Sequence, residues 1–272
     1  MDRAATVDFI KTHGILPESK FGQNFLCDDA IIASIIDAAK IEPGDKVLEI
    51  GPGIGALTRP LSKLDISLTC VEIDKRLAEL LRDDPDVKAE IIDSDYLKLK
   101  DYQSEDFDIV ISNLPYYVMT DIMKKLFAEC INVRKMVFMV EEDALERIIA
   151  SPRSKQYGPL SVLCSLYGRP EVVTRVPGTC FVPAPRTTSA VICMTRGENV
   201  MSKDLVLFTD RCFAMRRKKL KTALKCYDNV KVEEAYKSQG LDDNVRAEEL
   251  EPEAIMWLYN DIINAKYQRG TL

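Results

Sequence analysis

A glycine-rich stretch, EIGPGIG at residues 49–55, completes the apolar run that begins at Lys46 and precedes a helical pattern. Glycines such as Gly51 and Gly53 let a backbone approach a nucleotide closely. About twenty residues further on, Glu72 ends a second apolar run, where a carboxylate can accept hydrogen bonds from both hydroxyls of a ribose. This order of strand, glycine loop, helix and acid predicts a nucleotide- or nucleoside-binding site.

A further carboxylate, Asp95, follows the third apolar run of the chain. A carboxylate in that position is suited to accept hydrogen bonds from the exocyclic amine of an adenine ring. Asp93 lies nearby in the sequence and is an alternative for the same role. We assign the role to Asp95 and keep Asp93 as the alternative.

The most informative stretch is SNLPYY at residues 112–117, at the end of a fourth apolar run. The exocyclic amine of a base is a poor nucleophile because its lone pair is delocalised into the ring. The side-chain oxygen of Asn113 and the carbonyl oxygen of Leu114 can each accept one of the amine N–H bonds, which leaves the lone pair facing an electrophilic methyl group. Tyr116 can stack on a base that has been flipped out of its helix. The stretch therefore predicts methyl transfer to a base amine.

These groups need a scaffold that brings the ends of several strands together. Short apolar runs predict strands at residues 46–50, 68–73, 89–92, 107–112 and 135–140. Helical patterns lie before or between them at residues 28–39, 56–63, 75–82 and 121–130. Such alternation specifies a parallel sheet covered by helices on both faces, the doubly wound α/β class. Two more β-rich runs predict an antiparallel hairpin at the sheet edge, at residues 172–176 and 189–194.

The pattern changes in the last quarter of the chain, where helical stretches follow one another from residue 203 without a strand signal. We therefore predict two domains, a Rossmann-like domain over residues 1–196 and a small all-α domain over residues 197–272. A chain of 272 residues with 46% apolar residues can bury a sizeable core in this arrangement.

The residue inventory excludes several kinds of chemistry. The single histidine, His13, lies in the N-terminal segment, and none of the eight cysteines forms a CxxC pair. A Ser-His-Asp triad and the usual zinc sites therefore lack their residues, and we expect no metal. No apolar run approaches the roughly 18 residues of a membrane span, so we expect a cytoplasmic protein that does not enter the membrane.

With these motifs in order, the chain resembles the ribosomal RNA adenine dimethyltransferases, which use S-adenosylmethionine, over nearly its whole length. Besides the motifs above, the resemblance rests on KFGQNFL at residues 20–26, YGPLSV at 157–162 and FVPAP at 181–185. It implies the fold of a class I S-adenosylmethionine-dependent methyltransferase. It also implies that Phe181 stacks on the target adenine opposite Tyr116. The cofactor contacts that it implies are those of Asn24, Leu26, Gly51, Glu72, Asp95 and Asn113.

The family has two branches. One dimethylates two adjacent adenosines near the 3′ end of small-subunit (16S) ribosomal RNA, and the other methylates a single adenosine of large-subunit (23S) RNA and confers antibiotic resistance. FAMRRKKL at residues 213–220 and VRAEEL at 245–250 resemble the small-subunit branch, which implies a role in small-subunit biogenesis. The alternatives are the large-subunit enzyme and a ribosome-assembly factor whose catalysis is dispensable. A dinucleotide-dependent oxidoreductase would explain the glycine loop but gives no use to residues 113–116.

The charge distribution bears on the RNA partner. The net charge of −6 argues against nucleic acid at first sight, but residues 211–225 contain seven basic residues and no acidic one. On a continuous helix, four of the basic residues line a stripe that can follow a phosphate backbone; an ordinary solvated face is the alternative. We expect the chain to act as a monomer that binds ribosomal RNA through this stripe, made of Arg211, Lys218, Lys221 and Lys225.

Three residues, in two places, depart from the pattern of the family. Glu141 and Glu142 stand where Gln-Lys is usual, and Tyr96 follows Asp95 where a smaller residue is usual. The first departure concerns the RNA footprint, and the second concerns the shape of the adenine pocket.

Overall fold

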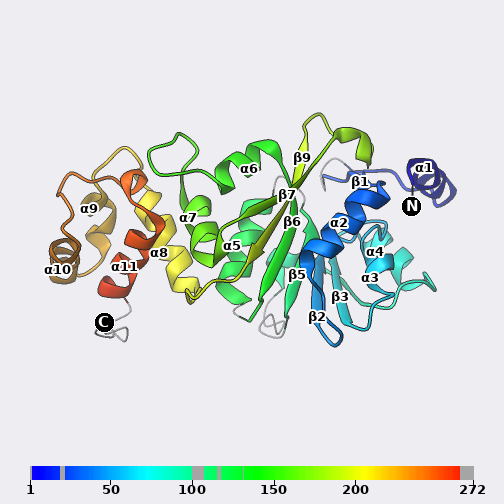
Figure 1. The fold of residues 1–272 in the computed structure, drawn as a ribbon, viewed down its shortest axis with the longest axis horizontal. Helices are drawn as coiled ribbons and strands as arrows, with labels where there is room; N and C mark the ends of the chain where they lie inside the picture. Colours follow the sequence, from blue (N-terminus) through cyan, green and yellow to red (C-terminus); the bar gives the residue numbers. More distant parts are fainter. Residues whose placement is uncertain (1, 19–21, 100–106, 115–117, 131, 264–272) are drawn as a thin grey trace.

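A seven-stranded sheet forms the centre of the computed structural model, which describes residues 2–18, 22–99, 107–114, 118–130 and 132–263 (Figure 1). The strand order is β4-β3-β2-β5-β6-β9-β7. In that order the strands are β4 (Glu90–Asp93), β3 (Ser67–Glu72), β2 (Lys46–Ile50), β5 (Ile109–Asn113), β6 (Lys135–Glu141), β9 (Ser189–Thr195) and β7 (Glu171–Val176).

Strands β2, β3, β4, β5 and β6 are parallel to one another. Strand β9 runs antiparallel to both of its neighbours, β6 and β7. The predicted parallel sheet and its antiparallel hairpin are thereby confirmed. The chain moves outward from β2 to β3 and β4 and then returns to place β5 on the other side of β2. The crevice outside the carboxyl ends of β2 and β5 is thus a topological switch point, the usual ligand site of such sheets.

Helices cover both faces of the sheet, as the alternating pattern predicted. On one face α2 (Asp29–Ala39) and α3 (Thr58–Leu61) pack with inward residues such as Val47 and Ile111. Asp28 caps α2, since its Oδ1 accepts the backbone N–H groups of Ala30 and Ile31 at 3.0 and 3.1 Å. The remaining helices of this part are α4 (Lys75–Arg82) and, on the other face, α5 (Met119–Glu129), α6 (Glu142–Ile148) and α7 (Pro159–Gly168).

The N-terminal segment contains structure that the sequence did not predict. Helix α1 (Arg3–Thr12) lies at one end of the molecule (Figure 1), and β1 (Phe25–Leu26) pairs antiparallel with β8 (Phe181–Val182). An Arg3 Nη1 donates to the carbonyl oxygen of Phe181 at 2.7 Å. Strands of two residues carry no periodic signal, so their pairing depends on tertiary contacts alone.

The C-terminal helices lie at the opposite end of the molecule from α1 (Figure 1). Their apolar side chains join those over one face of the sheet in one continuous core. Two stretches that resembled the family meet there, because the Tyr157 hydroxyl donates to the Leu250 carbonyl oxygen at 2.8 Å. The helices are α8 (Lys203–Phe213), α9 (Leu220–Ala223), α10 (Asn229–Gln239) and α11 (Pro252–Ile262).

The prediction of one continuous helix through residues 211–225 is wrong. Helix α8 ends at Phe213, and α9 begins only at Leu220. The Leu220 N–H donates to the carbonyl oxygen of Val245 at 2.8 Å, so this group is committed to a distant segment and not to the preceding turn. Four consecutive basic residues, 216–219, occupy the break, where a helix would stack like charges one turn apart.

Gly168 permits the close contact between α7 and the end of β9. A Cβ atom at this position would lie 1.8 Å from the Thr195 carbonyl oxygen and 2.7 Å from its carbonyl carbon. Because backbone cannot yield as a flexible side chain would, we expect Gly168→Ala to destabilise the fold by about 3 kcal/mol, which lowers Tm by roughly 6–12 °C. Gly158→Ala at the start of the same helix is the matched control, since its Cβ meets nothing within 4 Å. Equal melting temperatures for the two variants would contradict this prediction.

Candidate active site

A cavity with an empty volume of about 650 Å³, including its open mouth, lies at the topological switch point. It collects residues from three strands of the sheet, β2, β3 and β5, and from the segment before α2, as expected where the carboxyl ends of parallel strands meet. Six residues that the sequence assigned to the cofactor line it: Asn24, Leu26, Gly51, Gly53, Glu72 and Asn113.

The glycine loop and Glu72 form one hydrogen-bonded unit. Gly53 has φ +58° and donates its N–H to Glu72 Oε2 at 2.9 Å. A Cβ on Gly53 would lie 3.3 Å from the ring of Phe25, so the position requires glycine for both conformation and space. The other oxygen of Glu72 accepts the N–H of Asp74 at 2.8 Å. Burial raises the pKa of Glu72, and these backbone donors oppose that rise.

A second buried carboxyl, Glu49, lines the same cavity and was not singled out from the sequence. Its Oε2 accepts the Thr58 hydroxyl at 2.8 Å and the Cys70 thiol at 3.5 Å. Burial raises the pKa of Glu49 to about 7, with hydrogen bonds from Thr58 and Cys70 acting in the opposite direction. The available signal was a charged residue inside the apolar run of a central strand.

The segment before α2 closes one side of the cavity and is tied to the end of β3. Gln23 Nε2 donates to Asp74 Oδ2 at 2.9 Å, and Gln23 Oε1 accepts the N–H of Glu18 at 2.8 Å. Arg76 bonds Asp74 and Glu18 from the solvent side at 2.6 Å. Gln23 is therefore a second residue of the site that sequence reasoning missed. Lys20 and Phe21 of the family motif lie outside the described residues.

Asn113 lies at the carboxyl end of β5 and is oriented by the same segment. Its Nδ2 donates to the Asn24 carbonyl oxygen at 3.3 Å. Oδ1 makes no hydrogen bond to any residue within the described ranges and remains available as an acceptor. Leu114, the other predicted acceptor, has a buried side chain. Pro115 and Tyr116 lie outside the described residues, so the predicted stacking by Tyr116 stays a prediction.

Asp95 does not join the residues that line the cavity. It precedes the short helix Tyr96–Lys98, where its Oδ1 accepts the N–H of Leu97 at 3.0 Å and its Oδ2 lies 3.5 Å from Lys98 Nζ. A capping role therefore accounts for the position of its carboxylate. The unusual Tyr96 is 6% exposed and its hydroxyl lies 3.7 Å from Cys130 Sγ, so its ring belongs to the core.

Phe181 differs from the expected accessible stacking ring. The residue pairs with Leu26 across the β1–β8 ribbon, and its side chain is 0% exposed within the apolar cluster that also holds Leu26 and Val176. The strand register directs the ring inward, where packing stabilises it. A base can reach Phe181 only if its neighbours move.

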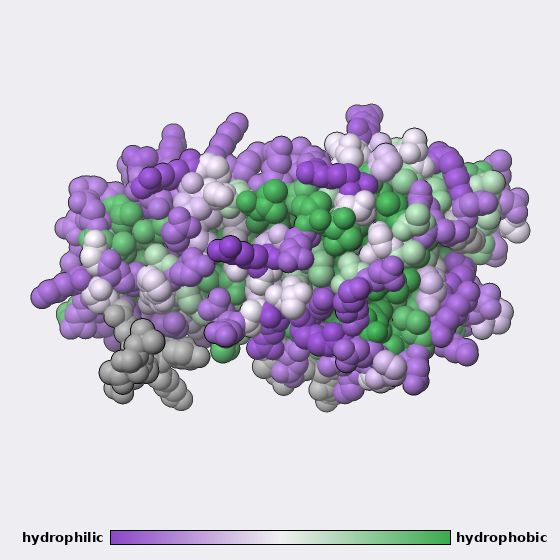
Figure 2. Space-filling view, viewed as in Figure 1, coloured by the Kyte–Doolittle hydropathy of each residue, from purple (hydrophilic) through white to green (hydrophobic). Residues whose placement is uncertain are grey.

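The predicted basic stripe is divided by the break between α8 and α9. Arg211 Nε donates to the Ala223 carbonyl oxygen at 2.7 Å, which fixes the turn between these helices. Lys221 Nζ lies 2.7 Å from Glu233 Oε2 and 2.8 Å from Asp243 Oδ1, and these hydrogen bonds raise its pKa. Lys218 and Lys225 are exposed and form no ion pair with any described residue. Hydrophilic side chains are spread over this end of the face drawn in Figure 2.

Glu141 and Glu142 hold the antiparallel hairpin together. Glu141 Oε1 accepts the Thr187 hydroxyl at 2.7 Å, and Glu142 forms an ion pair with Arg175 of β7. Both carboxylates therefore have partners within the protein, Thr187 and Arg175.

The described part of the chain contains neither a membrane-spanning helix nor a cluster of metal ligands. None of its helices is long and apolar enough to cross a membrane. Among the same residues, no group of three or more His, Cys, Asp or Glu side chains is arranged to hold a metal ion.

The chain is similar to known proteins in sequence and in fold. The chain is 35% identical over 271 residues to ribosomal RNA small subunit methyltransferase A of Streptococcus mutans serotype c, with 92% of each chain covered. It shares its fold with a dimethyladenosine transferase from Plasmodium falciparum, with a TM-score of 0.68 and 22% identity over 89% of this chain and 98% of that one. For the 23S rRNA methyltransferase ErmE the TM-score is 0.60, with 24% identity over 88% and 99% of the two chains.

The family assignment follows from the match of residues 17–264 to the model of the family described as ribosomal RNA adenine dimethylase. The matched range includes every strand of the central sheet and all the residues that line the cavity. On this ground, and on its identity to the streptococcal methyltransferase, the chain belongs to the ribosomal RNA adenine dimethylase family.

Proposed function

We propose that this protein transfers methyl groups from S-adenosylmethionine to the exocyclic amines of two adjacent adenosines near the 3′ end of small-subunit ribosomal RNA. The name of its streptococcal relative favours the small-subunit branch over the large-subunit branch. The observation that carries the chemistry is the position of Asn113 at the cavity, with its Nδ2 bonded to Asn24 and its Oδ1 available. Residues 113–116 have no comparable use in an oxidoreductase.

The residues that line the cavity fit the cofactor. Glu72 can accept ribose hydroxyls while its position is held by the N–H groups of Gly53 and Asp74. Two buried carboxyls, Glu49 and Glu72, face the cavity, and the lining contains no Lys, Arg or His among the described residues. Such a charge balance suits a cationic ligand, and S-adenosylmethionine carries a sulfonium. When bound, this cofactor supplies the electrophilic methyl group.

The chain itself supplies position and a partly dry environment. Asn113 Oδ1 accepts one N–H of the target amine, and the Leu114 carbonyl accepts the other, which points the nitrogen lone pair along the path of transfer. Buried apolar neighbours such as Leu26 and Phe25 limit water at the site. After one transfer the amine retains an N–H, so a second turnover needs only room for one methyl group in the pocket.

The proposed division of labour follows the chain. Residues 1–196 hold the cofactor and the target amine, and residues 197–272 help to hold the RNA. We propose that the protein does this as a monomer in the cytoplasm.

The direct test is transfer of labelled methyl groups from S-adenosylmethionine to purified small subunits that lack the 3′-end dimethyladenosines. Large-subunit RNA serves as the parallel substrate. We expect label on small-subunit RNA, recovered as dimethyladenosine. Label only on large-subunit RNA would move the protein to the other branch. Absence of label on both would favour an assembly factor that binds the subunit without modifying it.

The exposed lysines of the basic segment should contribute to RNA affinity, whereas the paired one should not. For Lys218→Ala combined with Lys225→Ala, we expect the slope of log K against log salt to fall by about 1.5, because each phosphate contact contributes about 0.7–0.9. Lys221→Ala should change the slope by less than about 0.3, since Glu233 and Asp243 already neutralise its charge. Filter binding to small-subunit RNA across a salt series measures the slope for each variant. A larger change for Lys221→Ala than for the double variant would refute the role of Lys218 and Lys225 in RNA binding.

A further inference from the structure

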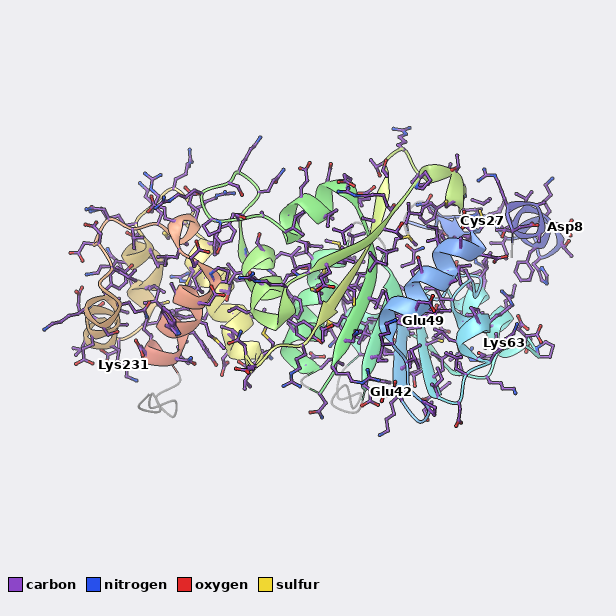
Figure 3. The ribbon with its side chains drawn as sticks, viewed as in Figure 1. Asp8, Cys27, Glu42, Glu49, Lys63 and Lys231 are labelled. Carbon is purple, nitrogen blue, oxygen red and sulfur yellow. The ribbon has the colours of Figure 1, made fainter. Side chains whose placement is uncertain are left out.

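One buried carboxyl of the pocket has no part in the transfer described above. Glu49 is 2% exposed at the carboxyl end of β2, inside the body of the molecule, whereas Glu42 lies at its edge (Figure 3). One oxygen, Oε2, is held by Thr58 and Cys70, while Oε1 accepts no hydrogen bond from any residue that the structure describes. Because Glu49 also lines the cavity, this free acceptor is available to a ligand.

Within the part of the chain that the structure describes, the neighbours of Glu49 supply hydrogen bonds but no positive charge. From α3 the facing polar group is the Thr58 hydroxyl, and from β3 the facing groups are the Cys70 thiol and the Glu72 carboxyl. On its other side β5 places Ile111 opposite Glu49, which brings no titratable group. Burial without a cation raises the pKa of Glu49 to about 7, so its charge is poised to respond to a charged ligand near neutral pH.

The methyl donor and its product differ by one charge at sulfur. S-adenosylmethionine has a sulfonium, whereas S-adenosylhomocysteine, the product, has a neutral thioether. A buried carboxylate gains strongly from a nearby cation and gains nothing comparable from a thioether. A group with these properties can therefore distinguish the two molecules by charge.

On the basis of the proposed function, we propose that Glu49 responds to the charge of the bound cofactor. Its carboxyl is ionised when S-adenosylmethionine is bound, whereas below neutral pH it is protonated when the pocket is empty or holds the product. Binding of the donor to protonated enzyme then releases one proton to solvent. In the transfer the target amine loses one proton to solvent as it gains the methyl group. The carboxyl of Glu49 then takes up one proton, so a complete turnover releases one proton in total and the charges balance. Glu49 thereby favours the donor over the product, which limits product inhibition.

The sign of the pH dependence follows from the lowered pKa of Glu49 in the donor complex. Donor binding must expel a proton below the pKa of the free enzyme, about 7, and need not do so above it. Because Glu49 stays ionised in the donor complex at both pH values, the donor Kd should fall about tenfold from pH 6 to pH 8. Product Kd should show no such fall, so the preference for donor over product should grow with pH.

Isothermal titration calorimetry of the full chain tests this inference. Both ligands are titrated at pH 6, 7 and 8 into the native protein and into Glu49→Gln, each in two buffers of different ionisation enthalpy. Because the amino groups of the ligands also titrate, the quantity compared is the ratio of variant Kd to native Kd at each pH. We expect this ratio to rise about tenfold from pH 6 to pH 8 for the donor and to change by less than about twofold for the product.

Proton release gives a second readout that does not depend on affinity. At pH 7 the native protein should release about half a proton more per donor bound than Glu49→Gln does, since half of Glu49 is then protonated. Thr58→Val removes the hydroxyl that lowers the pKa of Glu49, so it should move the pH midpoint upward. Glu79→Gln, an exposed carboxyl of α4, is the matched control and should behave as the native protein.

The outcomes separate this inference from the proposed function. Two results would overturn the role of Glu49 and leave the proposed methyl transfer unaffected. One is a donor ratio of variant Kd to native Kd that does not change with pH, and the other is equal proton release by the native protein and Glu49→Gln. Failure of the native protein to bind the donor at any pH would overturn the proposed function and this inference together. Melting temperatures of the variants show whether a change in binding reflects loss of fold.

Discussion

Asn113→Ala should lower methyl transfer by at least about 10³-fold, while S-adenosylmethionine still binds within about tenfold of the native Kd. The variant removes the Oδ1 that orients the amine lone pair, and orientation of reacting groups is worth several powers of ten in rate. The effect on cofactor binding should be small, because the variant removes from the cavity wall only the hydrogen bond between Asn113 Nδ2 and the Asn24 carbonyl oxygen, worth about 1 kcal/mol. Single-turnover transfer of labelled methyl and calorimetric binding measure the two effects separately.

A matched control for Asn113→Ala exists elsewhere in the chain. Asn199 Nδ2 likewise donates to a backbone carbonyl oxygen, that of Leu166, at 2.9 Å, but Asn199 does not line the cavity. Asn199→Ala should therefore transfer methyl groups within about twofold of the native rate. If Asn113→Ala lost binding and transfer to the same extent, its role would be to hold the cofactor and not to orient the amine.

For Glu72→Ala we expect cofactor Kd to rise by roughly 10²-fold or more. The variant removes acceptors for two ribose hydroxyls, each worth about 1.5–3 kcal/mol when the acceptor is charged. It also releases the N–H groups of Gly53 and Asp74, so the glycine loop loses its attachment to β3. Calorimetric titration with S-adenosylmethionine measures the loss.

The control for Glu72→Ala is Glu42→Ala, an exposed carboxyl remote from the cavity, which should bind normally. Melting curves are needed beside both titrations, because Glu72 is buried and its replacement leaves a space. A folded Glu72→Ala variant with cofactor Kd within about threefold of the native value would show that the ribose is held by other groups.

Much of the site could be predicted because its parts are local in sequence and are brought together by a general rule. Gly53, Glu72 and Asn113 each follow or end a strand with a clear apolar pattern. The carboxyl ends of parallel strands meet at one edge of the sheet, so the strand pattern alone implies that these residues converge. The structure does place all three at one cavity.

Other features depend on interactions that the sequence pattern does not show. Asp95 was assigned to the adenine from its position after a strand, and this role stays a prediction; one oxygen of its side chain caps the next turn, and such local hydrogen bonds compete with a ligand for the same oxygens. The basic stripe assumed a uniform helix, but the N–H of Leu220 bonds to Val245 in another segment. Neither competing interaction leaves a periodic signal in the sequence.

The sequence by itself determined the doubly wound sheet and the positions of the glycine loop and Asn113 at the carboxyl ends of their strands, because each depends on periodicity or on neighbours a few residues away. Only the tertiary structure decided the burial of Phe181, the capping role of Asp95, the break after Phe213 and the absence, among the described residues, of a cation beside Glu49. Each of these depends on which distant segments pack together. Burial and the surrounding charges, which set the pKa of Glu49, exist only once those segments have met.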